Sequence, residues 1–457
     1  MAILAKPNLT GTAAVQTRRM HYCWVIVAVL AMVQIFASSI SMAAGIMVPP
    51  LSDPEGSFRW GVGTIGAAIA TYYLFGAIFA PIAGSLGDRF GSRWMLLAAG
   101  AMYITSMILL GFVREIWHFF LFFGVMLSLT QSLAMVPLMA AVSGWFRRRL
   151  GLGVGILWAA GGIGTAILAP LIGYLIDALG WQGTFTIIGI VGGGIMLLLT
   201  PLLHSRPSDI GLKPYGARDS DPMPGAKDIA IEGLRLKAFN QSMRRTRAFW
   251  NLPIVHGLGC AGHGTVLIYV IPLAYERGVF SSLASASIII TVLSLVSIVS
   301  RFVTPVLAEM YGTRKMMAAS LSIQGATVLM LFWAQDPWVF YLFAAAFGLG
   351  FGGEWTGYLV INRQYFGEGP MGTLYGWQTT GALMGHAVAT ALAGLVLYAT
   401  GSYNLILGLS MGFSLSGVVV IAMLDPTSRV LIPHWEDSLP PEARSAPSGV
   451  SAPSPAD

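Results

Sequence analysis

Long apolar segments, each of helix length, follow one another along almost the whole sequence. Such a segment crosses the hydrocarbon layer of a bilayer, about 30 Å thick, with about 20 helical residues. The chain of 457 residues is 55% apolar and only 10% charged, which no ordinary soluble domain matches. We therefore predict an all-α membrane protein with twelve transmembrane helices, near residues 22–50, 61–86, 94–113, 117–143, 150–176, 184–203, 248–275, 281–308, 316–334, 338–362, 371–398 and 403–424.

Basic residues concentrate in every second connection between these segments. If both termini are cytoplasmic, the outer loops hold only Arg59, Arg114 and Arg277, and Arg301 alone lies within the membrane. Cytoplasmic loops of membrane proteins carry such an excess of Lys and Arg. The net charge of +6 therefore indicates orientation in the lipid bilayer and not a nucleic-acid partner. We expect a multi-pass protein of the cytoplasmic (inner) membrane with both termini inside.

A polar stretch interrupts the apolar segments after the sixth of them. It contains the run KPYGARDSDPMPGAKD and predicts a linker between two six-helix halves. The C-terminal residues, which include PPEARSAPSGVSAPSPAD, lack the apolar content to pack and predict disorder. The expected divisions are a cytoplasmic N-terminal segment (1–21), an N-terminal six-helix bundle (22–203), a cytoplasmic linker (204–247), a C-terminal six-helix bundle (248–424) and a disordered cytoplasmic tail (425–457).

The two halves repeat each other at a distance of 221 residues. GSLGDRFGSRWM, from Gly84, aligns without gaps on PVLAEMYGTRKM, from Pro305, so that Gly91 meets Gly312 and Arg93 meets Arg314. The same shift superposes five further glycine pairs, Gly151 on Gly372, Gly155 on Gly376, Gly164 on Gly385, Gly173 on Gly394 and Gly180 on Gly401. Parallel repeats related by an axis along the membrane normal are the architecture of transporters that alternate access around a site between the halves.

Enzymes and channels are the rival classes. The chain lacks HExxH, a GxSxG elbow and a Walker loop, which argues against zinc peptidases, esterases and ATP-driven pumps. Its two cysteines, Cys23 and Cys260, provide no disulfide framework. Neither rival accounts for parallel halves with matched charged loops. We therefore expect a carrier, not an enzyme, without cofactor or metal, and we expect a monomer.

The loop GSLGDRFGSR resembles the signature loop of the major facilitator superfamily, and the second half keeps Glu309, Gly312, Arg314 and Lys315 at the matching positions. WFRRRLGLGVGILWAAGGIG, RPSDIGLKP, RAFW and IPLAYERG resemble the branch of monocarboxylate transporters and oxalate/formate antiporters, in its bacterial form. This resemblance implies the twelve-helix major facilitator fold and transport of a small carboxylate, by proton symport or by anion exchange. A monocarboxylate is the expected substrate, and a dicarboxylate exchanged as in oxalate/formate antiporters, or an uncharged solute, is the alternative.

In that branch an arginine of the eighth helix binds the substrate carboxylate, and Arg301 is the matching residue. Ser297 occupies the position of an aspartate of the animal transporters, one turn before it, and Gln378 aligns with a lysine of the oxalate-type antiporters. The resemblance thus places Arg301, Ser297 and Gln378 at the substrate site.

The residues around Arg301 support a polar environment independently of the resemblance. Ser287, Thr291, Ser294, Ser297 and Thr304 recur at intervals of three or four, so they share one helical face with the arginine. A guanidinium binds a carboxylate through two parallel hydrogen bonds and keeps its charge. The alternative is a static contact, either with Glu354 or with a backbone carbonyl, that holds the two halves together.

Glu354 lies near the middle of the predicted tenth helix. Burial at that depth disfavours its ionised form, so it could carry a proton through the transport cycle. It could equally be a static partner of another polar group. His263 and His386 are further titratable groups in predicted helices, and packed, hydrogen-bonded histidines are the alternative for both.

Two other sets complete the candidates. Tyr72 and Tyr375, one from each half, are the preferred hydroxyl donors to substrate. Charged residues at the cytoplasmic helix ends can close an inner gate by pairing across the halves and meeting helix dipoles, or can serve orientation alone. These gating candidates are Asp88, Arg89, Arg93, Glu309 and Arg314.

Overall fold

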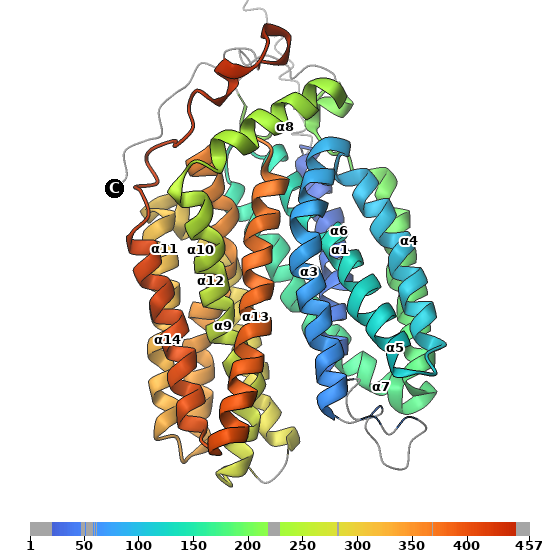
Figure 1. The fold of residues 1–457 in the computed structure, drawn as a ribbon, viewed down its shortest axis with the longest axis vertical. Coiled ribbons are helices and arrows are strands. Elements are labelled where there is room, and N and C mark those ends of the chain that lie inside the picture. Colours follow the sequence, from blue (N-terminus) through green and yellow to red (C-terminus); the bar gives the residue numbers. More distant parts are fainter. Residues whose placement is uncertain are drawn as a thin grey trace, which may run out of the picture.

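The computed structural model describes residues 21–46, 51, 58, 60, 62–217, 229–280, 283–367 and 369–444. Within these ranges every regular element is a helix, and the only extended pairing is an isolated bridge between Phe146 and Tyr215. The helices of the first half stand side by side with those of the second half (Figure 1). The chain therefore folds as the expected all-α bundle.

The first half contains α1 (Cys23–Ile46), α3 (Val62–Phe90), α4 (Ser92–Gly111), α5 (Ile116–Phe119), the π-helical segment η1 (Phe120–Leu127), α6 (Ser128–Trp145), α7 (Leu150–Leu199) and η2 (Thr200–Leu202). The short helix η3 (Pro207–Ile210) and α8 (Ile229–Met243) lie between the halves in sequence. The second half contains α9 (Arg247–Glu276), α10 (Leu283–Tyr311), α11 (Thr313–Thr327), η4 (Val328–Phe332), α12 (Pro337–Phe366), α13 (Met371–Thr400) and α14 (Tyr403–Ala422).

Nine helices within the described ranges are long and apolar enough to cross a membrane. The bounds of the helices agree with the predicted segments to within a few residues, and α7 contains two predicted segments joined at a break. The count of twelve spans and the side of the membrane on which the termini lie stay predictions. Most of the predicted N-terminal segment, 1–20, lies outside the described residues.

The internal repeat is visible in the backbone. Gly91 and Gly312, which the repeat superposes, separate α3 from α4 and α10 from α11 with φ angles of 92° and 94°. Gly180 breaks α7 with a φ of 70°, and its repeat mate Gly401 ends α13 with a φ of 63°. Residues with a side chain rarely adopt these angles, so glycine is required at both turns of each half.

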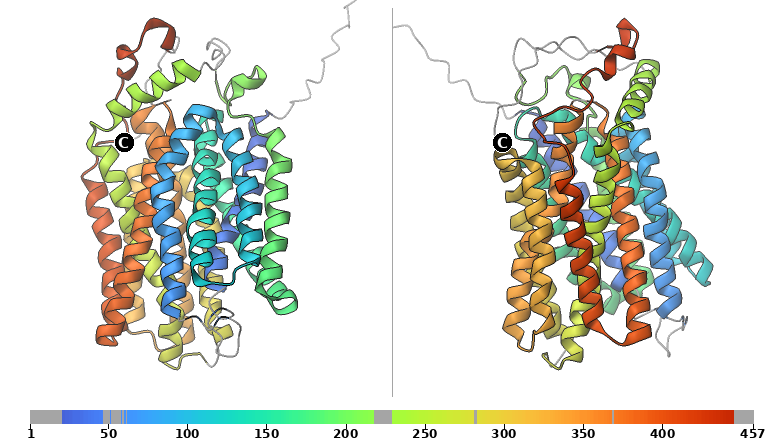
Figure 2. Two further views of the ribbon diagram at one scale, coloured as in Figure 1. Left: turned by 45° about the vertical axis from the view of Figure 1, so that its right-hand side comes forward. Right: turned by 60° about the vertical axis from the view of Figure 1, so that its left-hand side comes forward.

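The two halves pack tightly at one end, which we call the linker end because α8 and residues 201–217 lie there (Figures 1 and 2). A Cβ atom at Gly84 of α3 would lie 2.0 Å from the carbonyl oxygen of Gly372 in α13, and one at Gly151 of α7 would lie 2.5 Å from that of Pro305 in α10. Gly84 and Pro305 are repeat mates, and so are Gly151 and Gly372. The contact between the halves is therefore made twice, with the roles of the halves exchanged.

The buried apolar residues divide in the same way. One cluster joins both halves, and it includes Trp145, Leu157 and Trp158 of the first half with Tyr358, Tyr365 and Tyr375 of the second. Three further clusters each belong to one half. The first half holds one around Tyr72, Phe123 and Phe185 and a small one around Ala99, and the second half holds one around Phe343, Phe347 and Leu407. The halves thus share a core toward the linker end and keep separate cores toward the opposite end.

Residues 425–444 correct the predicted disordered tail. They contain the short helices η5 (Trp435–Ser438) and η6 (Pro441–Ala443), which lie against α8 (Figure 2). Arg235 of α8 lies over the ring of Trp435 at 5.1 Å, forms a 2.7 Å ion pair with Glu436 and donates to the carbonyl of Ala443. Contacts with the linker helix α8 thus hold these residues in place, although the tail itself has few apolar residues to pack. Residues 445–457 lie outside the described ranges.

Candidate functional site

Arg301 lies where α10 of the second half faces α7 of the first. Its Nη1 donates a 3.3 Å hydrogen bond to the backbone oxygen of Trp158, and its guanidinium carbon lies 5.2 Å from the centroid of the Phe351 ring. A Cβ atom at Gly162 of α7 would lie 2.7 Å from the Ile298 side chain and 3.4 Å from Nη1, so α7 and α10 approach closely beside the guanidinium. The buried Nε has no hydrogen-bond partner among the described residues. Arg301 thus contacts both halves and retains an unused donor.

Of the two static contacts considered for Arg301, the structure shows the backbone carbonyl. No ion pair joins Arg301 to Glu354, both of which are described residues. A hydrogen bond to a neutral carbonyl leaves the positive charge uncompensated, which is costly within a membrane. The arginine therefore still lacks a counter-ion from the described part of the chain.

The hydroxyl groups around Arg301 serve helix packing. Ser297, which is buried, donates to the carbonyl of Ser294 at 2.8 Å in its own helix. Ser300 donates to the carbonyl of Leu349 in α12 at 2.5 Å and lies 3.2 Å from the hydroxyl of Thr304. This face of α10 packs against α12, where Gly352 approaches the backbone oxygen of Ser297. The structure therefore does not bring the Ser297 hydroxyl to the guanidinium.

Glu354 is fully buried in a polar cluster inside the second half. Its Oε1 accepts a 3.2 Å hydrogen bond from the hydroxyl of Tyr358, and its Oε2 lies 3.0 Å from Nδ1 of His263 in α9. His256 stacks on the Tyr358 ring with centroids 3.9 Å apart. The carboxyl group is thus surrounded by titratable side chains of α9 and α12.

His386 of α13 links this cluster to the first half. Its ring centroid lies 5.0 Å from that of His263 and 5.6 Å from that of Tyr73 in α3, on which it stacks. Tyr72 packs instead against Phe123 at 5.4 Å within the first-half core. Of the adjacent residues Tyr72 and Tyr73, it is therefore Tyr73 that contacts the second half.

Tyr375 and Gln378 lie on α13 but away from the guanidinium contacts. Tyr375 is buried in the core shared by both halves. Gln378 exchanges two hydrogen bonds with Asn362 of α12, of 2.9 and 2.6 Å, and both side chains are fully buried. The amide of Gln378 is thus occupied by a partner within its own half.

Two acidic residues bridge the halves at the linker end. Asp88 of α3 accepts hydrogen bonds from the backbone nitrogens of Gly372 and Thr373, at 2.8 and 2.7 Å, in the first turn of α13. Its repeat mate Glu309 of α10 accepts one from the backbone nitrogen of Gly151 in the first turn of α7. A carboxylate at a helix N-terminus satisfies unpaired backbone donors and meets the positive end of the helix dipole. The structure brings these two gating candidates to equivalent positions.

The basic gating candidates make contacts within their own halves. Arg89 lies over the ring of Phe90 at 5.2 Å, and the backbone nitrogen of Arg93 donates to the hydroxyl of Ser205. Nη1 of Arg314 donates to the carbonyl of Leu424 at 2.5 Å. Among the gating candidates, the hydrogen bonds across the interface described above are made by the two acids.

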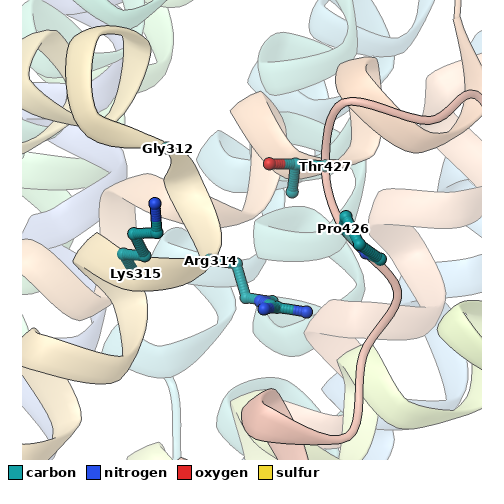
Figure 3. A pocket seen from close by; sticks show the side chains of 5 residues that line it. All are labelled: Gly312, Arg314, Lys315, Pro426 and Thr427. Carbon is teal, nitrogen blue, oxygen red and sulfur yellow. The ribbon is translucent and has the colours of Figure 1, made fainter. Parts of the chain in front are cut away.

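Beside Arg314 a pocket opens at the linker end of the second half. It is lined by Gly312, Arg314, Lys315, Pro426 and Thr427, where the turn between α10 and α11 faces the start of the tail (Figure 3). None of these residues contacts Arg301 or Glu354, so this pocket is separate from the site between the halves.

Two residues of the site were missed by the sequence analysis. His256 and Cys260 precede His263 on α9 at intervals of four and three residues, which places all three on one face. The spacing was available in the sequence, but a cysteine or histidine within an apolar helix carries no signal of its own. Tyr73 is one of several tyrosines that could donate a hydroxyl to substrate, but the preferred pair was Tyr72 and Tyr375.

A family model described as Major Facilitator Superfamily matches residues 25–281 and 260–449. Monocarboxylate transporter 12 of Rattus norvegicus is 23% identical over 360 residues, 73% of this chain and 72% of that protein. Monocarboxylate transporter 2 of Homo sapiens is 24% identical over 286 residues, 60% of this chain and 58% of that protein. Monocarboxylate transporter 11 of Homo sapiens is 25% identical over 198 residues, and the match spans only 38% of that protein and 43% of this chain.

Among solved structures, a proton:xylose symporter of the major facilitator superfamily, bound to 6-bromo-6-deoxy-D-glucose, is similar with a TM-score of 0.68. The sequence identity is 12%, and the match covers 89% of this chain and 96% of that one, so the likeness shows the fold alone. The family's members and these relatives are transporters, which excludes the enzyme alternative. The chain belongs to the major facilitator superfamily, as a multi-pass membrane transporter related to the monocarboxylate transporters.

Proposed function

We propose that this transporter carries a small organic anion, preferentially a monocarboxylate, and that Arg301 binds the carboxylate. The observation that carries the proposal is the guanidinium between the halves, with its charge uncompensated and its Nε without a partner among the described residues. A carboxylate satisfies both needs, because it accepts two parallel hydrogen bonds and neutralises the charge. Phe351 beside the guanidinium and Trp355 beside Trp158 favour an apolar body on the substrate.

A single negative charge suits this site best. The predicted membrane core holds one arginine and no lysine, and a buried anion must be neutralised if its desolvation is to be repaid. Glu354, when ionised, would repel a second carboxylate. The names of the curated relatives point to the same substrate class. Dicarboxylates and uncharged solutes remain the alternatives.

Alternating access supplies the mechanism. The shared core, the glycine contacts and the two acid contacts to helix N-termini hold the linker end closed, while the cores toward the opposite end stay separate. With the linker end facing the cytoplasm, as the charge distribution predicts, this conformation presents the site to the outside. Breaking the linker-end contacts as the halves rock would present Arg301 to the cytoplasm.

The transport cycle runs either as proton symport or as anion exchange. Glu354 supports symport, because a fully buried carboxyl group beside His263 and the Tyr358 hydroxyl can hold a proton without a fixed cation. His386 and Tyr73 extend this cluster to the interface. We propose that the protein acts as a monomer in the cytoplasmic membrane.

Counterflow in proteoliposomes tests the proposal. Vesicles loaded with an unlabelled solute are placed in a trace of the same labelled solute, and a carrier accumulates label without turnover to product. The panel compares lactate- and pyruvate-like acids and aromatic monocarboxylates with oxalate, succinate and an uncharged sugar. Preferred counterflow of monocarboxylates supports the proposal, whereas preferred exchange of a dicarboxylate or of the sugar contradicts it.

A further inference from the structure

Five metal-binding side chains meet inside the second half. His256, Cys260 and His263 come from one face of α9, Glu354 comes from α12 and His386 from α13. The ligand atoms of Cys260, His263 and His386 all lie within 4.8 Å of one another, and so do those of His256, Cys260 and Glu354. Cys260 thus belongs to two sets of three donors from different helices.

The polar atoms of this cluster are poorly satisfied. The side chains of His256 and His263 are only 1% and 0% exposed, and their ring nitrogens make no hydrogen bond of standard geometry to a described residue. Their interactions with the backbone of Gln378, for His256, and with Glu354, Gln324 and Gly259, for His263, are poorly aligned. Oε2 of Glu354 likewise makes no hydrogen bond of standard geometry, because Nδ1 of His263, although 3.0 Å away, is not aligned with it. Buried polar atoms are almost always well paired, so several poorly paired ones at one point leave donors for a further partner.

We propose that Cys260, His263 and His386 bind a thiophilic metal ion with a filled d shell, Cu⁺ or Zn²⁺. One thiolate and two imidazoles are ligands that both ions accept. The Cys260 thiol releases its proton on binding, to Glu354 or to water, so the thiolate and Cu⁺ form a neutral site. Zn²⁺ carries one charge more, which ionised Glu354 offsets from the adjoining set of donors.

The site extends to the interface between the halves and is distinct from the carboxylate anchor. His386 is partly exposed and stacks on Tyr73 of the other half, which places this ligand at the interface. Phe351 lies between this cluster and the carboxylate anchor, since its ring lies 4.8 Å from that of His263 and 5.2 Å from the guanidinium carbon of Arg301. Metal binding can therefore be measured without transport, and it can fail or succeed independently of carboxylate binding at Arg301.

The test uses the purified full-length protein in detergent, titrated with Co²⁺, as a spectroscopic substitute for Zn²⁺, and with Cu⁺ against a chromogenic chelator. We expect one ion per chain and, for Co²⁺, a thiolate charge-transfer absorption. Cys260→Ser should abolish that absorption and weaken binding by at least about 10- to 100-fold, the range for loss of even an outer-shell partner. His386→Gln, a change on a different helix, should weaken binding similarly.

Two variants serve as matched controls. Cys23→Ser changes the other buried cysteine, which lies on α1, and His434→Gln changes a histidine that is 81% exposed near the tail. Both should bind as the native protein does. A higher affinity for Cu⁺ identifies the neutral three-donor site, whereas a higher affinity for Co²⁺ that falls in Glu354→Gln identifies the site with the added carboxylate. The proposal is overturned if the native protein binds neither ion at micromolar concentration. It is also overturned if the Cys260→Ser and His386→Gln variants elute as the native protein does and bind the ions with unchanged affinity.

Discussion

The guanidinium of Arg301 shows what a sequence can and cannot reveal about one residue. A charge in an apolar segment is costly, so the sequence alone marks Arg301 as a residue that needs a partner. Which group becomes that partner depends on how each helix is rotated about its own axis, and the sequence does not determine this rotation. Successive residues of a helix point about 100° apart, and for this reason Tyr73 faces His386 while Tyr72 faces Phe123. Ser297 and Gln378 were placed by resemblance, and both hydrogen-bond within their own half.

Glu354→Gln separates proton coupling from substrate binding. Glutamine keeps the size of the side chain and its contact with the Tyr358 hydroxyl but cannot exchange a proton. We expect counterflow, which needs no net proton movement, to stay within about twofold of wild type, and uptake driven by a pH gradient to be lost. Both are measured in the same proteoliposomes.

The control for that experiment is Glu115→Gln, which changes an exposed carboxylate in the loop between α4 and α5. It should leave both activities unchanged. Wild-type uptake that ignores a proton gradient would remove the case for symport and leave Glu354 as a static partner of its neighbours.

At the level of helices, the repeat explains why the linker end closes. Asp88 meets the first turn of α13 as Glu309 meets the first turn of α7, and the repeat superposes each partner on its mate. The repeated charged loop predicts that charges and helix dipoles meet here. Which of its residues reach the helix N-termini could not be predicted, because the backbone N–H groups that bind them are the same at every position of a sequence.

Asp88→Asn should slow transport far more than it weakens substrate binding. Asp88 touches no candidate substrate residue, and its loss removes charge-assisted hydrogen bonds, worth roughly 1.5–3 kcal/mol, from only one conformation. That free energy corresponds to about a 10- to 100-fold change in the balance of conformations. Initial rates of counterflow and the affinity for the best monocarboxylate measure the two effects. Parallel losses in rate and affinity would argue against a gate, and Glu309→Gln should follow the same pattern.

At the scale of the whole molecule, hydropathy and the 221-residue repeat predicted the helices and the two halves. The structure adds which end is tightly packed, and this could not be predicted because the conformations of a transport cycle share one sequence. The order of residues 425–444 was also hidden, since it depends on Arg235 of a helix about 200 residues earlier.

Orientation can be tested with two engineered cysteines, because both native cysteines are buried. Ser402→Cys lies at the start of α14, away from the linker end, and Ser428→Cys lies at the exposed start of the tail. In intact cells an impermeant thiol reagent should label the first and not the second, and permeabilised cells should show labelling of both. The reverse pattern in intact cells would invert the topology and the direction in which the site opens.

The most direct measurement of the central claim is counterflow of the best monocarboxylate by Arg301→Lys. Lysine keeps the positive charge but cannot form two parallel hydrogen bonds to one carboxylate. Loss of one charge-assisted hydrogen bond, roughly 1.5–3 kcal/mol, predicts a decrease of about 10- to 100-fold in counterflow at low substrate concentration. The matched control, Arg114→Lys in an exposed loop, should transport as wild type does. Near-normal counterflow by Arg301→Lys would contradict the account and leave the arginine as a structural contact with the Trp158 carbonyl.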